Sequence, residues 1–91
     1  MSYRVELAPP ARRAIERLRP IVGIAVRGLI ASLAHDPHPP HTRKVVGTVL
    51  YRIRLRVDGV PWRVVYTISD TDQLVVVTRV VRRDEATYRG L

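Results

Sequence analysis

Hydrophobic and polar residues alternate along several short segments of the chain, as they do in strands that bury one face. The alternation is clearest in YRIRLRV, residues 51–57, and it returns in WRVVYTIS, residues 62–69. SYRVEL, residues 2–7, shares this pattern, and a further strand follows the SDTDQ turn. Together the segments predict strands over residues 2–7, about 49–57, 62–69 and 74–81.

The segment between the first two predicted strands has a helical period instead. Apolar residues recur every three or four positions after Pro9 and Pro10, and again over roughly residues 21–35. Proline is tolerated in the first turn of a helix, whereas Pro20 ends or kinks the first of the two. The sequence therefore predicts two helices, followed by a proline-rich loop over residues 36–44.

The element order βααβββ indicates an α+β domain, with a helical hairpin packed on a mostly antiparallel four-stranded sheet. The length of 91 residues fits one domain, over residues 1–91, with one modest core. No secretory signal is visible, and the longest apolar stretch is interrupted by Arg27 and too short to span a bilayer. We therefore expect a cytoplasmic protein that does not bind membranes.

The charge of the chain narrows the choice of partner. Sixteen Lys+Arg residues against eight Asp+Glu residues give a formal net charge of +8, and Lys44 is the only lysine. A small domain this basic usually meets a polyanion, so RNA, DNA and an acidic protein all remain open. Because the chain has no cysteine, disulfides and thiol-based metal sites are excluded.

Strand parity predicts that the arginines of the central hairpin share one face. The pairing that we expect across the VDGVP turn places Arg56 opposite Arg63. The same pairing places Arg54 opposite Val65. Like charges directly opposite each other destabilise a sheet, and neither strand has an acidic residue to neutralise them. The face is either a solvated basic surface or a cradle in which arginines converge on phosphate. Its members are Arg52, Arg54, Arg56 and Arg63.

The last predicted strand extends this face in one of two ways, depending on the SDTDQ turn. With a five-residue turn, Arg79 falls opposite Arg63, and Arg83 continues on the same face. With a four-residue turn, Arg82 does so instead. Both registers remain open at this point.

Three histidines, His35, His38 and His41, lie three residues apart in and before the proline-rich loop. Imidazole is a good zinc ligand, but two prolines separate the last two histidines, and no cysteine or carboxylate pattern completes a ligand set. We therefore expect no metal site, and we interpret the segment as a flexible loop that faces RNA.

Over essentially its whole length the chain resembles the RelE toxins of the RelE/ParE superfamily. The resemblance rests on the element order and on four motifs: K-V-V-G, Y-R-I-R-L-R, D-G-V-P-W-R-V-V-Y, and V-V-R-R-D with a later tyrosine. It implies a microbial-ribonuclease-like fold and the toxin role in a type II toxin–antitoxin system. It also implies a ribosome-dependent endoribonuclease that cleaves mRNA in the A site, where a 2′-hydroxyl attacks the adjacent phosphate. The implied partners are a cognate RelB-like antitoxin and the 70S ribosome with its mRNA, and no cofactor is implied.

The resemblance further implies roles for residues of the central strands. Arg52 and Arg54 stand where the family has basic residues, often lysines, near the nucleophile and the phosphate. Arg63 stands at the arginine that stabilises the transition state. Lys44 matches the basic residue before the glycine of the first motif, here Gly47.

The C-terminal motif carries two more implied roles. Arg83 matches a basic residue often assigned as general acid, and Arg82 is the neighbouring candidate for the same position. Tyr88 matches a tyrosine that stacks on or orients the substrate. The implied catalytic set is thus Arg52, Arg54, Arg63, Arg83 and Tyr88, and the implied RNA-binding set is Lys44, Arg56, Arg79 and Arg82.

The chain departs from the family in one respect. Arginine is a poor general base, and neither a lysine, a carboxylate nor a histidine is expected on the arginine-bearing face. The chemistry would then depend on positioning and electrostatics. Two alternatives therefore stay open: a ParE-like toxin that inhibits DNA gyrase, and a catalytically weak relative that only binds RNA or a partner.

Overall fold

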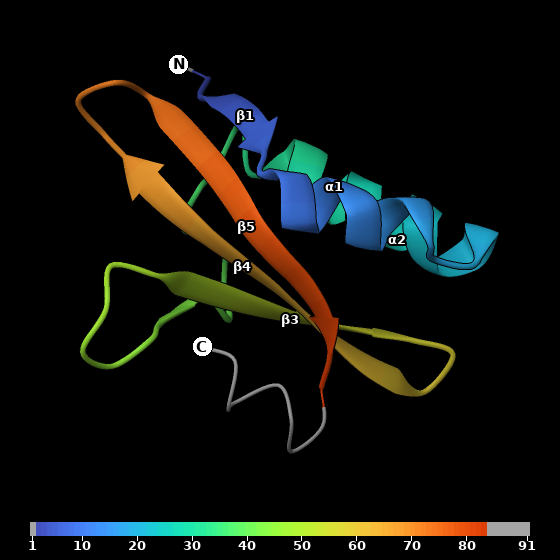
Figure 1. Ribbon diagram of the computed structural model, residues 1–91. Coiled ribbons are helices and arrows are strands. Elements are labelled where there is room, and N and C mark those ends of the chain that lie inside the picture. The colour runs from blue at the N-terminus through green and yellow to red at the C-terminus, as the bar shows by residue number, and fades with distance from the viewer. Residues whose placement is uncertain (1, 84–91) are drawn as a thin grey trace.

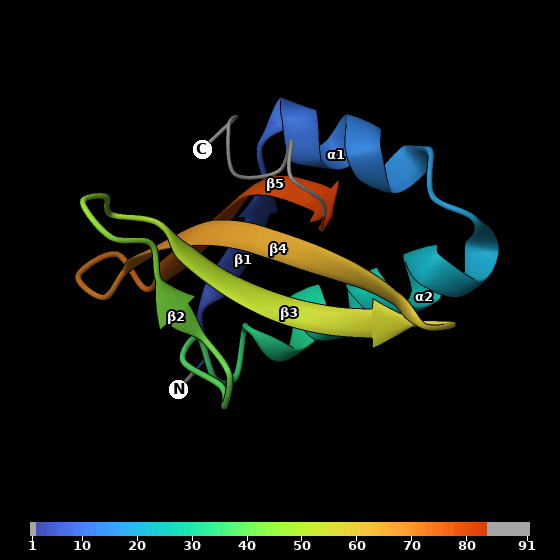
Figure 2. The same ribbon diagram turned by 90° about the horizontal axis from the view of Figure 1, so that it is seen from below.

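The computed structural model describes residues 2–83, which contain five strands and two helices. The sheet has the order β1-β5-β4-β3-β2, in which β1 runs parallel to β5 and the other neighbours are antiparallel (Figure 1 and Figure 2). The strands are β1 (Arg4–Leu7), β2 (Arg43–Lys44), β3 (Tyr51–Val57), β4 (Val60–Ser69) and β5 (Leu74–Arg82), and the helices are α1 (Pro9–Glu16) and α2 (Pro20–Ser32).

The α+β class and the pair of helices are confirmed, whereas the four-stranded sheet was wrong by one strand. Part of the proline-rich loop returns to the sheet, because Arg43 and Lys44 pair with Arg52 and Tyr51 at the edge of β3. A strand of two residues is too short to show alternation, so periodicity could not reveal it. None of the described helices is long and apolar enough to cross a membrane.

Both helices cover the same face of the sheet, with α1 along β5 and α2 behind β3 (Figure 2). Each helix begins with proline in its first turn, where the missing N–H costs nothing. The buried apolar residues between the helices and the sheet form the core, and the opposite face of the sheet is left for other side chains. The core residues are Ala11, Ile15, Val22, Val26, Ile30, Leu33, Ile53, Val57, Val64, Tyr66, Val75, Val77 and Val80.

The turn between β3 and β4 is tighter than the VDGVP motif suggested. Val57 pairs with Val60, so only Asp58 and Gly59 form the turn, and their φ angles are 50° and 77°. Two successive residues with positive φ match a type I′ turn, for which Asp-Gly is a favoured pair. This turn matches the twist of the flanking strands and therefore sets the hairpin register.

The predicted pairing of the hairpin was wrong by two residues. Arg54, and not Arg56, lies opposite Arg63, and Arg52 lies opposite Val65. A shift of two residues keeps every side chain on its face, because side chains alternate with a period of two. The prediction that these arginines share one face therefore survives the change of register.

Neither register expected for the last strand holds. The loop between β4 and β5 has four residues, since Ser69 pairs with Leu74. The register then shifts between Val65 and Tyr66, where β5 inserts Thr78 as an extra residue. As a result Arg79 lies opposite Val65, not opposite Arg63.

Gly28 offers a test of the helical packing, because it is exposed in α2 and an added Cβ would meet nothing within 4 Å. We expect Gly28→Ala to stabilise the fold by about 1 kcal/mol, since glycine is the weaker helix former. Thermal denaturation should show a rise in Tm of roughly 4–8 °C. Gly59→Ala is the control, and its positive φ predicts a fall in Tm. A fall for both variants would contradict the open space at Gly28.

Candidate active site

The face of the sheet opposite the helices carries basic side chains in adjoining rows that cross the strands. In one row Arg43, Arg52, Val65 and Arg79 are successive Cα partners on β2, β3, β4 and β5. In the next row Arg54 pairs with Arg63, which pairs with Val81. Arg56 has the same parity further along β3. We call this surface the arginine face, and its members are Arg43, Arg52, Arg54, Arg56, Arg63 and Arg79.

Arg63 is only 1% exposed, although it carries a charge and lies directly opposite Arg54. Strands β2 to β5 contain no Asp or Glu, and the one acidic residue of the described strands, Glu6, lies on the edge strand β1, where it pairs with Arg4. The Nη1 atom of Arg52 is also buried and has no hydrogen-bond partner among the described residues. A surface of this kind is suited to an anion that accepts several hydrogen bonds at once.

A small pocket of about 170 Å³ opens at the β3 end of the row that contains Arg54 and Arg63. The pocket is lined by His41, Arg43 and Arg54. Continuing the antiparallel register by two residues beyond the Arg43–Arg52 pair brings His41 alongside Arg54. His41 was expected only in a flexible loop, and Arg43 was not singled out at all. The missed signal is the basic pair Arg43–Lys44 after the prolines, which forms β2.

The loop before β2 is held from the helix side of the sheet. The hydroxyl of the buried Tyr66 donates a hydrogen bond to the carbonyl oxygen of Pro37 at 2.9 Å, and its oxygen lies 3.3 Å from Oγ1 of Thr42. The Tyr66 ring stacks on Tyr51 with centroids 6.1 Å apart, and Tyr51 meets the His38 ring edge-on at 5.4 Å. These contacts fix both ends of the segment that carries the pocket histidine.

Burial raises the pKa of Tyr66, and this effect outweighs the hydrogen bond with Thr42, which lowers it. The folded protein thus favours the neutral phenol. The stability that this tyrosine contributes is complete below its ordinary pKa of about 10 and is lost as the pH rises through the higher folded value. We therefore expect the free energy of unfolding to fall above about pH 10, and to fall less in Tyr66→Phe.

Urea denaturation of both proteins between about pH 8 and 11 measures this difference. The hydrogen bond to Asp70 raises the pKa of Tyr3, so Tyr3 titrates in the same range. It does so in both proteins, so the difference between them reports Tyr66 alone. Parallel curves for the two proteins would contradict the assignment.

The remaining predicted residues are divided between the two faces. Lys44 pairs with Tyr51, so strand alternation assigns Lys44 to the face that the helices cover. Arg82 pairs with Trp62 and is assigned to the same face. Arg83 is exposed beside β4, where its backbone N–H donates a hydrogen bond to the carbonyl oxygen of Pro61 at 2.9 Å. Since Arg56 also pairs with Pro61, Arg83 continues a row of the arginine face. Tyr88 lies outside the described residues.

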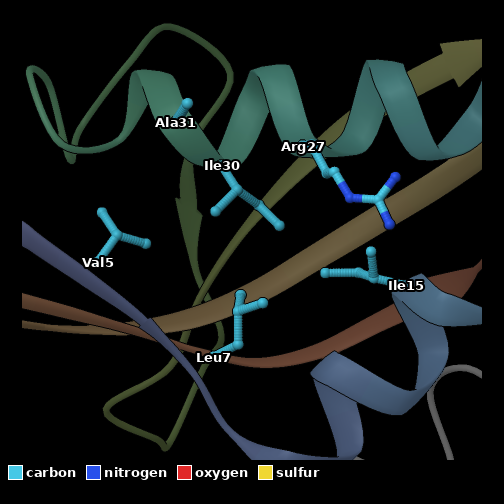
Figure 3. Close-up of a pocket in the computed structure, with 6 residues that line it drawn as sticks. All are labelled: Val5, Leu7, Ile15, Arg27, Ile30 and Ala31. Atoms are coloured by element: carbon cyan, nitrogen blue, oxygen red, sulfur yellow. The ribbon is translucent and has the colours of Figure 1, made fainter.

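A second pocket, of about 290 Å³, lies on the helix side between β1, α1 and α2 (Figure 3). Ile30 and Arg27 point from α2 towards Leu7 and Ile15, so one cation borders an otherwise apolar hollow. It contains no nucleophile or acid–base pair. Among the described residues, no group of three or more His, Cys, Asp or Glu could hold a metal ion.

Comparison with known proteins adds a family and a fold. The family described as the ParE toxin of the type II toxin–antitoxin system parDE matches residues 5–87. The toxin–antitoxin complex RelBE2 of Mycobacterium tuberculosis contains a similar chain, with 24% identity, a TM-score of 0.76, and coverage of 91% of this chain and 100% of that one. No curated protein matches the chain.

Two further solved structures have the same fold. The intact RelBE toxin–antitoxin complex of E. coli contains a chain with 22% identity and a TM-score of 0.76, covering 92% of this chain and 100% of that one. The archaeal RelE–RelB complex of Pyrococcus horikoshii contains one with 21% identity and a TM-score of 0.70, covering 93% and 99%. At such identities the likeness establishes the architecture of the sheet and helices.

Proposed function

The chain belongs to the ParE toxin family of type II toxin–antitoxin systems, and on that premise we propose that it is a ribosome-dependent endoribonuclease of the RelE kind. Membership of the RelE/ParE superfamily, and with it the toxin role, is the part of the prediction that is confirmed. The cleavage of mRNA in the ribosomal A site is the proposal.

The observation that carries the proposal is the direct pairing of Arg54 with the buried Arg63. Paired Cα atoms on neighbouring strands lie about 4.5–5.5 Å apart, so two guanidinium groups can reach one phosphate. Attack of a 2′-hydroxyl on that phosphate builds up negative charge on its oxygens. Fixed donors aimed at this charge stabilise the transition state more than the substrate, which accelerates the reaction.

The neighbouring row extends the surface along an RNA backbone. Arg52 and Arg79 flank the buried Val65, and both arginines have the parity of Arg54 and Arg63. Arginine suits this role because its planar fork contacts phosphate through two parallel hydrogen bonds. The arginines of the two rows are regularly spaced, as are the phosphates of a nucleic acid backbone, whereas the carboxylates of an acidic protein are scattered. The rows therefore favour a phosphodiester backbone as the ligand.

We propose a RelB-like antitoxin as the second partner, as in the solved complexes of similar toxins. The net charge of +8 favours an acidic protein. The helix-side pocket gives such a protein an apolar hollow with Arg27 at its border. The proposal also implies action in the cytoplasm, where ribosomes translate mRNA.

The test is primer extension on an mRNA translated by purified ribosomes in the presence of the toxin. We expect cuts at positions set by the reading frame, and no cuts when ribosomes are omitted. A cognate antitoxin should suppress them. Binding of the toxin to ribosomes without any cut would instead favour the catalytically weak relative.

The name of the matching family favours a second candidate, inhibition of DNA gyrase. A gyrase inhibitor needs no pair of arginines at a phosphate, so it leaves the Arg54–Arg63 pairing unexplained. A supercoiling assay separates the two candidates. Inhibition of supercoiling by a preparation that leaves translated mRNA intact would overturn the ribonuclease proposal.

A further inference from the structure

We propose that His41 is the proton acceptor of the reaction, an inference that rests on the proposed ribonuclease function. An attacking 2′-hydroxyl must lose its proton, and an arginine cannot accept it because guanidinium stays charged. The two rows that contain Arg52 and Arg54 hold only arginines and valines, and the one acidic residue of the described strands, Glu6, lies on the edge strand β1, paired with Arg4. The base must therefore come from a side chain beside the rows.

His41 lies where such a base is needed. It lines the pocket together with Arg43 and Arg54, and Arg54 is the direct partner of Arg63. Imidazole is the side chain best suited to accept and donate protons near neutral pH. His41 is also exposed, so substrate can reach its ring.

The backbone of His41 is held in an unusual conformation, with φ at 73°. For a residue other than glycine this left-handed region is unfavourable, and such strain persists only where the surroundings enforce it. Here they do, because Tyr66 holds Pro37 and Thr42 on either side of the histidine. Strain of this kind is typical of residues that are positioned for a function.

The pocket also limits what binds beside His41. Its volume of about 170 Å³ is below the range of about 300–1,000 Å³ that encloses a drug-sized molecule. A phosphate with its adjacent 2′-hydroxyl fits this space better than a whole nucleotide. With two arginines in its wall, the pocket selects an anionic group. The ligand class is thus a ribose phosphodiester, and DNA lacks the hydroxyl that the histidine would deprotonate.

The step balances as follows. One ring nitrogen of His41 takes the proton of the 2′-hydroxyl as the O2′–P bond forms and the P–O5′ bond breaks. The released 5′-oxygen takes a proton from water, and the imidazolium returns its proton to water. The products are a 2′,3′-cyclic phosphate and a 5′-hydroxyl end, and no metal or redox partner is consumed.

Two variants separate the proton acceptor from the backbone conformation. Asparagine and glycine both tolerate positive φ, so His41→Asn and His41→Gly keep the loop and remove the imidazole. We expect either variant to lose 10²- to 10⁴-fold in single-turnover cleavage of ribosome-bound mRNA, the usual share of general acid–base catalysis. Ribosome binding should stay unchanged. Added imidazole should restore cleavage by His41→Gly.

His35→Gln is the matched control, because it removes another exposed histidine that does not line the pocket, and it should cleave like wild type. Full cleavage by His41→Asn would overturn the assignment while leaving the ribonuclease function intact. A fall in ribosome binding as large as the fall in cleavage would overturn it too. If wild type itself cuts no mRNA on ribosomes, the ribonuclease function and the role of His41 fail together.

Discussion

Replacing Arg63 with methionine is expected to abolish toxicity while the protein stays folded. Arg63 is almost fully buried and lies opposite Arg54, so its charge is held at the centre of the proposed site. Losing one well-placed donor to a developing oxyanion costs on the order of 10²–10³ in rate. Methionine keeps an unbranched side chain in the space of the arginine stem, so no large cavity is left in the packing.

Methionine is the informative substitution because alanine would leave a cavity where a large side chain was packed. Large-to-small substitutions in a core cost about 2–5 kcal/mol, which could unfold a small domain and remove toxicity for a trivial reason. Growth after induction, cleavage of ribosome-bound mRNA and thermal denaturation should be measured on the same variant. Toxicity that persists in a folded Arg63→Met protein would exclude the proposed role.

The second large effect is expected from a pair of variants, Arg54→Ala and Arg82→Ala. Both remove one exposed arginine, so each lowers the net charge by the same amount. Arg54 belongs to the arginine face, whereas Arg82 has the parity of the helix side. We expect Arg54→Ala to lose on the order of 10²–10³ in cleavage rate, and Arg82→Ala to lose less than about tenfold.

The comparison separates local chemistry from the general attraction of a basic protein for RNA. That attraction depends on the number of charges and weakens steeply with salt, so both variants should lose the same modest share of ribosome affinity. Equal losses of cleavage would mean that the overall charge matters and the arrangement of the arginine face does not. Ribosome binding of both variants should be measured at two salt concentrations. The cleavage rate should be measured separately, at a toxin concentration that saturates the ribosomes.

How far the sequence predicts this molecule depends on the property considered. Parity depends only on the period of two along a strand, so the grouping of Arg52, Arg54 and Arg63 on one face could be predicted. The register of β3 against β4 depends on the type of turn between them. Asp58–Gly59 is a favoured pair for a type I′ turn, so the sequence does indicate the register. The VDGVP motif was instead interpreted as a longer turn, which shifted the pairing by two residues.

Other parts of the site could not be predicted, because they depend on contacts between distant segments. Thr78 is an inserted residue in β5 that no periodic pattern marks. The strand Arg43–Lys44 exists only because the edge of β3 is there to pair with it. The burial of Arg63 contradicts the ordinary preference of arginine for the surface, so it could be seen only in the folded structure.

The hydroxyl of Tyr66 has a consequence for the order of folding. Tyr66 is fully buried on the helix side, yet it holds the loop that brings His41 to the opposite face. A hairpin of β3 and β4 alone would already display its arginines, but the pocket requires the packed tyrosine. On the proposed function, we therefore expect a chain whose core has not packed to display its arginines without cleaving RNA, so that cleavage depends on complete folding.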